Sequence, residues 1–206
     1  LFLVYHHNDR FEQCSPNGRF FMSKSRTVAF YGVTAALVFV LLFLETYVFQ
    51  IIPLFNFAPP AIFTLPFAFA LSMFRGKKSM FFGGTCVGVC SFIIALILGN
   101  PIFINPIISV LPRVLCGLIA TGFYMLIKKL CGEKKFGTAL ASAVGGALGV
   151  LMNTVLVLFT MFLFQASTLE AIYATLISIN FVCEFVGAIL LAPLFVTLLQ
   201  KYAKLD

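Results

Sequence analysis

Few side chains capable of chemistry interrupt the long apolar stretches of this sequence. Arg113, Asn153, Asn180 and Glu184 lie inside such stretches, and Asn105 lies just before the stretch that holds Arg113. An ionisable group at membrane depth is costly and marks a functional site by default. The arginine fork suits a carboxylate or a phosphate, and asparagine can both donate and accept hydrogen bonds. These residues therefore predict a binding site for a small anionic molecule.

Arg113 and Glu184 could instead have purely structural roles. Arg113 could form an ion pair with Glu184, or its guanidinium could reach out to the membrane interface. Arg113 lies about six residues into its apolar stretch, near 9 Å from the outer end, whereas Glu184 lies about fifteen residues into another. The vertical offset argues against a direct pair, and both roles stay open beside ligand binding.

Enzyme chemistry finds little support in the sequence. Motifs of the H-E-x-x-H, G-x-S-x-G and P-loop types are absent, and the only histidines, His6 and His7, precede the apolar stretches. None of the cysteines forms a C-x-x-C pair; they are Cys14, Cys86, Cys90, Cys116, Cys131 and Cys183. We therefore expect no enzymatic activity, no cofactor and no bound metal. ATP hydrolysis would require a partner protein.

The composition predicts a membrane protein. Hydrophobic residues make up 61% of the chain and charged residues only 10%, and the mean hydropathy is +1.06. Soluble domains hold roughly 25% charged residues, so lipid must cover much of this surface. The net charge of +7 is spread over short clusters between apolar runs, which predicts membrane topology and excludes a nucleic-acid partner.

Apolar runs predict an all-α membrane protein, a single bundle of six transmembrane helices. The expected helices span residues 27–44, 61–74, 79–98, 107–130, 136–164 and 169–202. Pro66 interrupts the short second run, and Pro112 lies in the first turns of the fourth. Glu45 is expected to cap the outer end of the first helix. Residues 22–206 form the membrane domain, and we expect residues 1–21 to be an extension without function.

Basic residues alternate between the connections. Three connections, 45–60, 99–106 and 165–169, contain no lysine or arginine. The other segments carry Lys24 and Arg26, then Arg75, Lys77 and Lys78, then Lys128, Lys129, Lys134 and Lys135, and finally Lys201 and Lys204. The positive-inside rule therefore places both termini in the cytoplasm.

Two further features bear on partners and ligands. The first outward connection is rich in aromatic residues such as Tyr47, which favours either an interfacial belt or a lid over a cavity.

The first helix carries Ala29, Gly32 and Ala36 on one face. Small residues let membrane helices approach closely, so this face predicts either packing inside the bundle or docking of a partner protein.

Residues 105–117, Asn-Pro-Ile-Ile-Ser-Val-Leu-Pro-Arg-Val-Leu-Cys-Gly, complete a pattern that resembles the S-components of energy-coupling factor (ECF) vitamin transporters. The resemblance covers about residues 22–205. It implies a substrate-binding subunit of the bacterial cytoplasmic membrane, whose fourth to sixth helices and first outer loop form the site. Arg113, Asn153, Asn180 and Glu184 fall where that family places ligand contacts.

The resemblance also implies a partner. An alanine-rich face of the first helix docks on a transmembrane coupling subunit that joins two cytoplasmic ATPases. The usual A-x-x-x-A stands here as Gly32-x-x-x-Ala36, which leaves the docking register undetermined.

The substrate follows from Arg113, which calls for an anionic group. Pantothenate offers a carboxylate together with hydroxyl and amide groups, and is the leading prediction. Folate, riboflavin and pyridoxine-type compounds are alternatives. Two other classes stay open: a gradient-driven transporter in which Glu184 carries a proton, and an assembly subunit that binds no small molecule.

Overall fold

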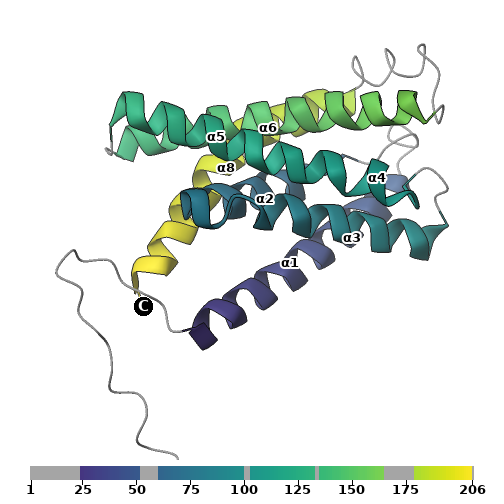
Figure 1. Cartoon of the computed structure of the whole chain (residues 1–206), viewed down its shortest axis with the longest axis horizontal. Helices are drawn as coiled ribbons and strands as arrows, with labels where there is room; N and C mark the ends of the chain where they lie inside the picture. Colours follow the sequence, from purple (N-terminus) through teal and green to yellow (C-terminus); the bar gives the residue numbers. More distant parts are fainter. Residues whose placement is uncertain (1–23, 52–59, 100–102, 133–134, 165–178, 206) are drawn as a thin grey trace, which may run out of the picture.

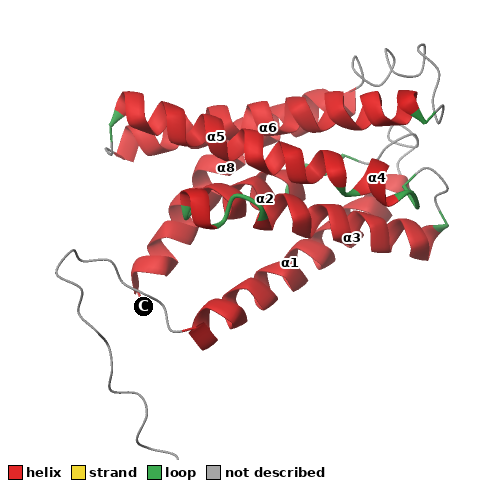
Figure 2. Cartoon of the chain, in the orientation of Figure 1, coloured by secondary structure: helices red, strands yellow, loops and turns green. Residues whose placement is uncertain are grey.

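The computed structural model describes residues 24–51, 60–99, 103–132, 135–164 and 179–205, all in helices and short connections without a strand (Figure 2). The elements are α1 (Lys24–Gln50), α2 (Thr64–Met73), the 3-10 turn η2 (Gly76–Lys78), α3 (Phe82–Leu98), α4 (Pro106–Ser109), α5 (Leu111–Cys131), α6 (Lys135–Leu163) and α8 (Ile179–Leu205). The predicted extension 1–21 lies outside the described residues.

Five helical segments are long and apolar enough to cross a membrane. They are Thr27–Phe49, Gly76–Leu98, Pro106–Cys131, Phe136–Leu163 and Ile179–Tyr202. The all-α fold is thus confirmed, and the helices have the length and composition of a multi-pass membrane protein. The number of six spanning helices is not confirmed, because α2 has only 10 residues. At a rise of about 1.5 Å per residue it covers about 15 Å, half of a hydrocarbon core of about 30 Å.

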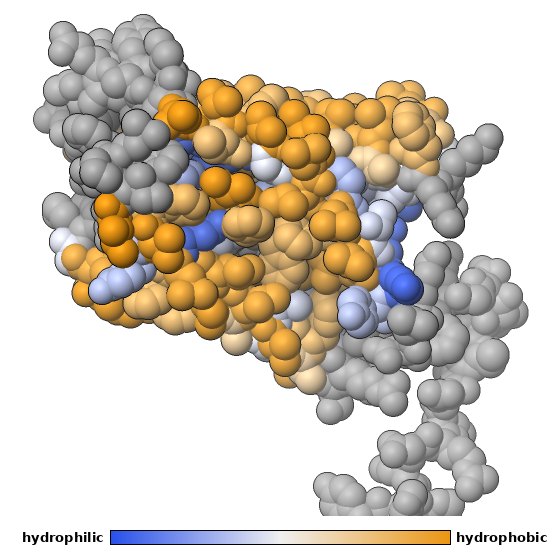
Figure 3. All heavy atoms as spheres, turned by 180° about the vertical axis from the view of Figure 1, so that it is seen from behind, coloured by the Kyte–Doolittle hydropathy of each residue, from blue (hydrophilic) through white to orange (hydrophobic). Residues whose placement is uncertain are grey.

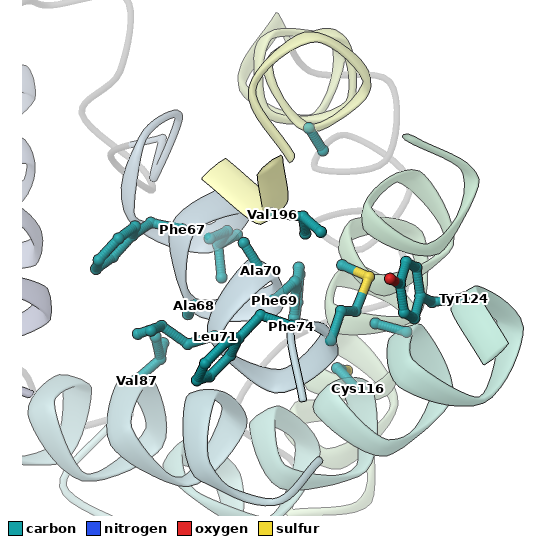
Figure 4. Close-up of a cluster of buried hydrophobic side chains, with 14 of the residues drawn as sticks. Phe67, Ala68, Phe69, Ala70, Leu71, Phe74, Val87, Cys116, Tyr124 and Val196 are labelled. Carbon is teal, nitrogen blue, oxygen red and sulfur yellow. The ribbon is translucent and has the colours of Figure 1, made fainter. Parts of the chain in front are cut away.

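The short helix α2 forms the centre of the bundle. All ten of its residues are buried, and it packs against α3, α5, α6 and α8. Figure 4 shows side chains of α2, among them Phe69 and Leu71, in one buried cluster with Val87, Cys116 and Val196 of the surrounding helices. A helix that is apolar on every side is covered either by other helices or by lipid, and α2 is too short to cross the lipid. Its length therefore suits a core element.

The helices run alternately in opposite directions (Figure 1). At one end, named the α4 end, α3 and α6 finish while α4 and α8 begin. At the opposite end, named the lysine end, α5 and α8 finish and η2 joins α2 to α3. Helix α1 crosses the bundle obliquely and contacts α2 and α3. The far face of the molecule is mostly apolar, with hydrophilic atoms recessed between apolar ones (Figure 3).

Glycines set the close approach of the central helices. A methyl group at Gly84 of α3 would lie 2.3 Å from the Arg113 carbonyl oxygen of α5, and one at Gly149 of α6 would lie 3.0 Å from Ala120 Cβ. Small residues therefore let α5 and α6 pack closely inside the bundle. Gly122 of α5 is different, because nothing lies within 4 Å of a methyl group there.

Candidate functional site

The predicted helix 107–130 is broken, and Arg113 bridges the break. Helix α4 ends at Ser109 and α5 begins at Leu111, with Pro112 in its first turn. Proline has no N–H, so the Ile108 carbonyl four residues earlier loses its helical donor. Arg113 Nη1 donates to the carbonyl oxygens of Ile108 at 2.7 Å and Ser109 at 2.9 Å. The guanidinium thus supplies the donor that Pro112 lacks.

The rest of the Arg113 guanidinium is not used in this way. Its Cζ lies 5.2 Å from the centroid of the Phe103 ring, a cation–π contact. Nε and Nη2 make no hydrogen bond to the described residues, and Arg113 is only partly buried. No ion pair joins Arg113 to Glu184 within the described part of the chain. Of the three guanidinium nitrogens, Nη1 therefore bonds the backbone, whereas Nε and Nη2 remain available to a ligand.

Two carboxylates from different helices hold the start of α2. Glu45 of α1 accepts hydrogen bonds from the Phe63 N–H at 2.6 Å, the Thr64 N–H at 3.2 Å and the Thr64 hydroxyl. Glu184 of α8 accepts one from the Ala61 N–H at 2.9 Å. The first N–H groups of a helix have no partner inside the helix, and the hydrocarbon core offers no water to replace one. The two glutamates meet this need.

This contact corrects one expectation and qualifies another. Glu45 does not cap the end of its own helix: α1 continues to Gln50, and Glu45 is a buried residue within it. The interaction partner, Thr64, is nineteen residues further along the chain. Glu184, predicted to bind substrate, uses Oε1 on the backbone of α2. Its Oε2 accepts no hydrogen bond from the described residues.

Asn153 lies close in height to Arg113. The contact between Gly149 and Ala120 sets the register of the antiparallel helices α5 and α6. It places Asn153 level with Cys116, three residues or about 4.5 Å from Arg113 along the bundle axis.

The register of α6 against α8 sets the heights of Asn180 and Glu184 along the bundle axis. A methyl group at Gly146 would contact both Ala188 and Ala192. This places Asn153 opposite the neighbourhood of Glu184. Asn180 lies one turn nearer the α4 end, at about the height of Arg113. Arg113 and Asn180 thus form one polar layer, and Asn153 and Glu184 form the next. The structure thus places these four predicted residues at neighbouring heights of the bundle, on α5, α6 and α8.

Two buried oxygens near these layers lack a partner. Asn153 Oδ1 and Ser109 Oγ are buried and have no hydrogen-bond partner in the described part of the chain. Ser109 is fully buried and lies on α4, which packs against α5 and α6. Buried polar groups are nearly always hydrogen-bonded, and an exception calls for an explanation. A ligand that donates hydrogen bonds would provide one.

The other predicted ligand contacts lie elsewhere. Asn105 Oδ1 accepts the Ile107 N–H at 3.0 Å and caps α4, so its side chain has a local structural role. Tyr47 is 58% exposed on α1 and stacks on Phe43 with ring centroids 6.2 Å apart. Neither residue joins the polar layers. Much of the predicted lid, residues 52–59, lies outside the described residues.

The small residues of α1 face outward. Ala29, Gly32 and Ala36 are exposed, and nothing lies within 4 Å of a methyl group at Gly32. Val33 and Val40, on the same side of the helix, are 70% and 50% exposed. Packing inside the bundle therefore does not account for the small-residue face.

No protein-family model matches this chain, and no curated protein is significantly similar to it. The resemblance to ECF S-components thus stays a prediction.

Within the described residues no three His, Cys, Asp or Glu side chains gather as a metal site. The sequence did not predict that Phe103, Ser109 and Thr64 take part in these contacts. Thr64 alone could have been anticipated, because it follows a proline-rich connection at the start of an apolar run.

Proposed function

We propose that this protein is the substrate-binding subunit of a membrane transporter and captures a small anionic molecule in the polar layers of α5, α6 and α8. The site chemistry favours a carboxylate carried on a molecule with hydroxyl or amide N–H groups. Pantothenate has this combination and is the leading substrate, with folate-, riboflavin- and pyridoxine-type compounds as alternatives. We expect the chain to bind without chemical conversion.

The observation that carries the proposal is the unused hydrogen-bonding capacity of Asn153 and Arg113. Asn153 Oδ1 is a buried acceptor without a donor. Arg113, about one turn away, keeps two nitrogens that make no hydrogen bond to the described residues. A molecule that brings a negative charge to Arg113 and a donor to Asn153 would satisfy both. A purely structural subunit would have no reason to keep this acceptor buried.

The outward face of α1 supports the second half of the proposal. Membrane helices associate through small residues that allow close backbone approach. Ala29, Gly32 and Ala36 form such a face, and no described helix covers it. We propose that a transmembrane coupling subunit packs here and links the protein to ATPases in the cytoplasm of a bacterium.

Thermal unfolding of the purified protein against a panel of B vitamins tests the binding half. A ligand that binds only the folded state stabilises it by about 2.7 kcal/mol at a hundredfold excess over its Kd. We expect one anionic vitamin to raise the unfolding temperature, with pantothenate first. A panel in which no compound does so would contradict the proposal.

Substitution of Gly32 tests the coupling half. Gly32→Leu fills open space on the protein itself, so it should leave vitamin binding unchanged and abolish uptake in cells. Gly122→Leu is the matched control, since Gly122 also has nothing within 4 Å but lies on α5. Uptake that survives Gly32→Leu would reject docking through α1.

A further inference from the structure

The lysine end of the bundle gathers positive charge from three segments that are distant in sequence. A methyl group at Gly76 of η2 would lie 3.7 Å from the Met125 sulfur of α5. Gln200 of α8 donates to the Tyr124 hydroxyl of α5 at 3.1 Å. These contacts bring together the basic residues that adjoin them, which we name the lysine cluster: Lys77, Lys128, Lys129 and Lys201.

The charge of this cluster is not balanced by acids of the described chain. Glu45 and Glu184 are the only acidic residues in the described ranges, and both bind the start of α2. The flanking sequence adds two acids, Glu133 and Asp206, against three more lysines, Lys134, Lys135 and Lys204. Three of the four cluster lysines are exposed. The surface therefore carries a net positive charge that an anionic partner can meet.

Aromatic side chains place the cluster at the headgroup level of a bilayer. Phe81, Phe136 and Tyr202 lie within one turn of helix ends at this end and are 56%, 78% and 66% exposed. Tyrosine is enriched at membrane–water interfaces, so Tyr202 supports this placement. The Lys128 ammonium lies 5.9 Å from the centroid of the Tyr124 ring, a cation–π contact that holds Lys128 at the end of α5.

We infer that the lysine cluster is a binding site for the phosphate headgroups of anionic phospholipids. The ligand class is an anionic glycerophospholipid, with its phosphate among the lysines and its acyl chains against the apolar helices. In Figure 3, the apolar surface of the helices adjoins hydrophilic residues at the ends of the molecule. Juxtamembrane basic residues are attracted to anionic lipid surfaces, and each contributes about a fivefold gain in affinity.

The test uses the full chain in phosphatidylcholine nanodiscs with increasing fractions of phosphatidylglycerol, with bound lipid counted by native mass spectrometry. Lys77→Gln combined with Lys128→Gln and Lys129→Gln should weaken phosphatidylglycerol binding by roughly 100-fold. The same three positions changed to Arg should retain it. Thermal unfolding in pure phosphatidylcholine identifies any variant that fails to fold.

Single substitutions separate a site from general attraction. Lys77→Gln should weaken binding about fivefold, and Lys24→Gln, which removes the same charge from the start of α1, should have a much smaller effect. Equal effects of the two would overturn the inference. So would equal competition by inorganic phosphate or glycerol phosphate, because the site would then select a free anion instead of a lipid.

Discussion

Glu45→Gln is the sharpest test of how the short helix α2 is held. The substitution keeps the shape of the side chain but turns one carboxylate oxygen into an NH₂ group. Glu45 accepts three hydrogen bonds, from the Phe63 N–H, the Thr64 N–H and the Thr64 hydroxyl. Glutamine can keep the first, but its NH₂ then faces the Thr64 N–H, and the Thr64 hydroxyl must turn to accept from the NH₂ group.

The expected cost follows from these contacts. Hydrogen bonds to a charged group contribute about 1.5–3 kcal/mol each, and a buried donor left without an acceptor adds its own penalty. Losing the bond to the Thr64 N–H, leaving that N–H without an acceptor and making the other two bonds neutral should lower the free energy of unfolding by roughly 3–5 kcal/mol. Thr64→Val, which removes only the hydroxyl donor, should cost about 1.5–3 kcal/mol.

Equilibrium unfolding in mixed detergent and SDS micelles, followed by circular dichroism, measures these differences. The double substitution provides the internal control. In the Glu45→Gln background, Thr64→Val should cost only about 0.5–1.5 kcal/mol, because the hydroxyl then bonds a neutral amide instead of a carboxylate. Costs that add without coupling, or a Glu45→Gln protein as stable as the original, would refute the capping of α2 by Glu45.

Two further predictions concern α5 and its neighbours. Arg113→Ala should lower stability by about 2–4 kcal/mol through the lost bonds to Ile108 and Ser109. This cost should shrink by about 1 kcal/mol in a Pro112→Ala protein, because the new N–H of residue 112 can donate to the Ile108 carbonyl. The same micelle unfolding assay measures both costs. An unchanged cost in the Pro112→Ala protein would contradict the role given to Arg113. Gly84→Ala should destabilise the fold by about 1–3 kcal/mol because its methyl group meets the backbone of α5, whereas Gly122→Ala should be nearly neutral; equal thermal unfolding temperatures for the two would reject the packing.

Hydrophobicity and small residues predicted most of the architecture. The apolar runs located the long helices, since a chain this apolar can be stable only as membrane-crossing or core helices. The limits of α1 were wrong for a physical reason. Glu45 was read as a boundary, yet it continues the helix because its carboxylate is satisfied by backbone N–H groups at residues 63 and 64. That interaction is invisible along the sequence.

The polar residues of the site were predictable, but their tasks were not. Arg113, Asn153, Asn180 and Glu184 stood out because polar groups are rare in apolar runs. Their common height depends on the register set by Gly146 and Gly149. The partial use of Arg113 on backbone carbonyls depends on the break at Pro112. The signal for that break, a proline in the first turns, was present, although its consequence for Arg113 needs three-dimensional contacts.

Titration of the purified protein with pantothenate, and with any other vitamin that raises its unfolding temperature, tests the central claim most directly. The account predicts saturable binding that weakens by about 5- to 150-fold in Asn153→Leu, which leaves a buried donor of the ligand without its acceptor at a cost of about 1–3 kcal/mol. Tyr47→Leu, on the exposed face of α1, should bind as the original does. Binding that is unchanged in Asn153→Leu, or absent for every compound in the original protein, would contradict a substrate site in the polar layers.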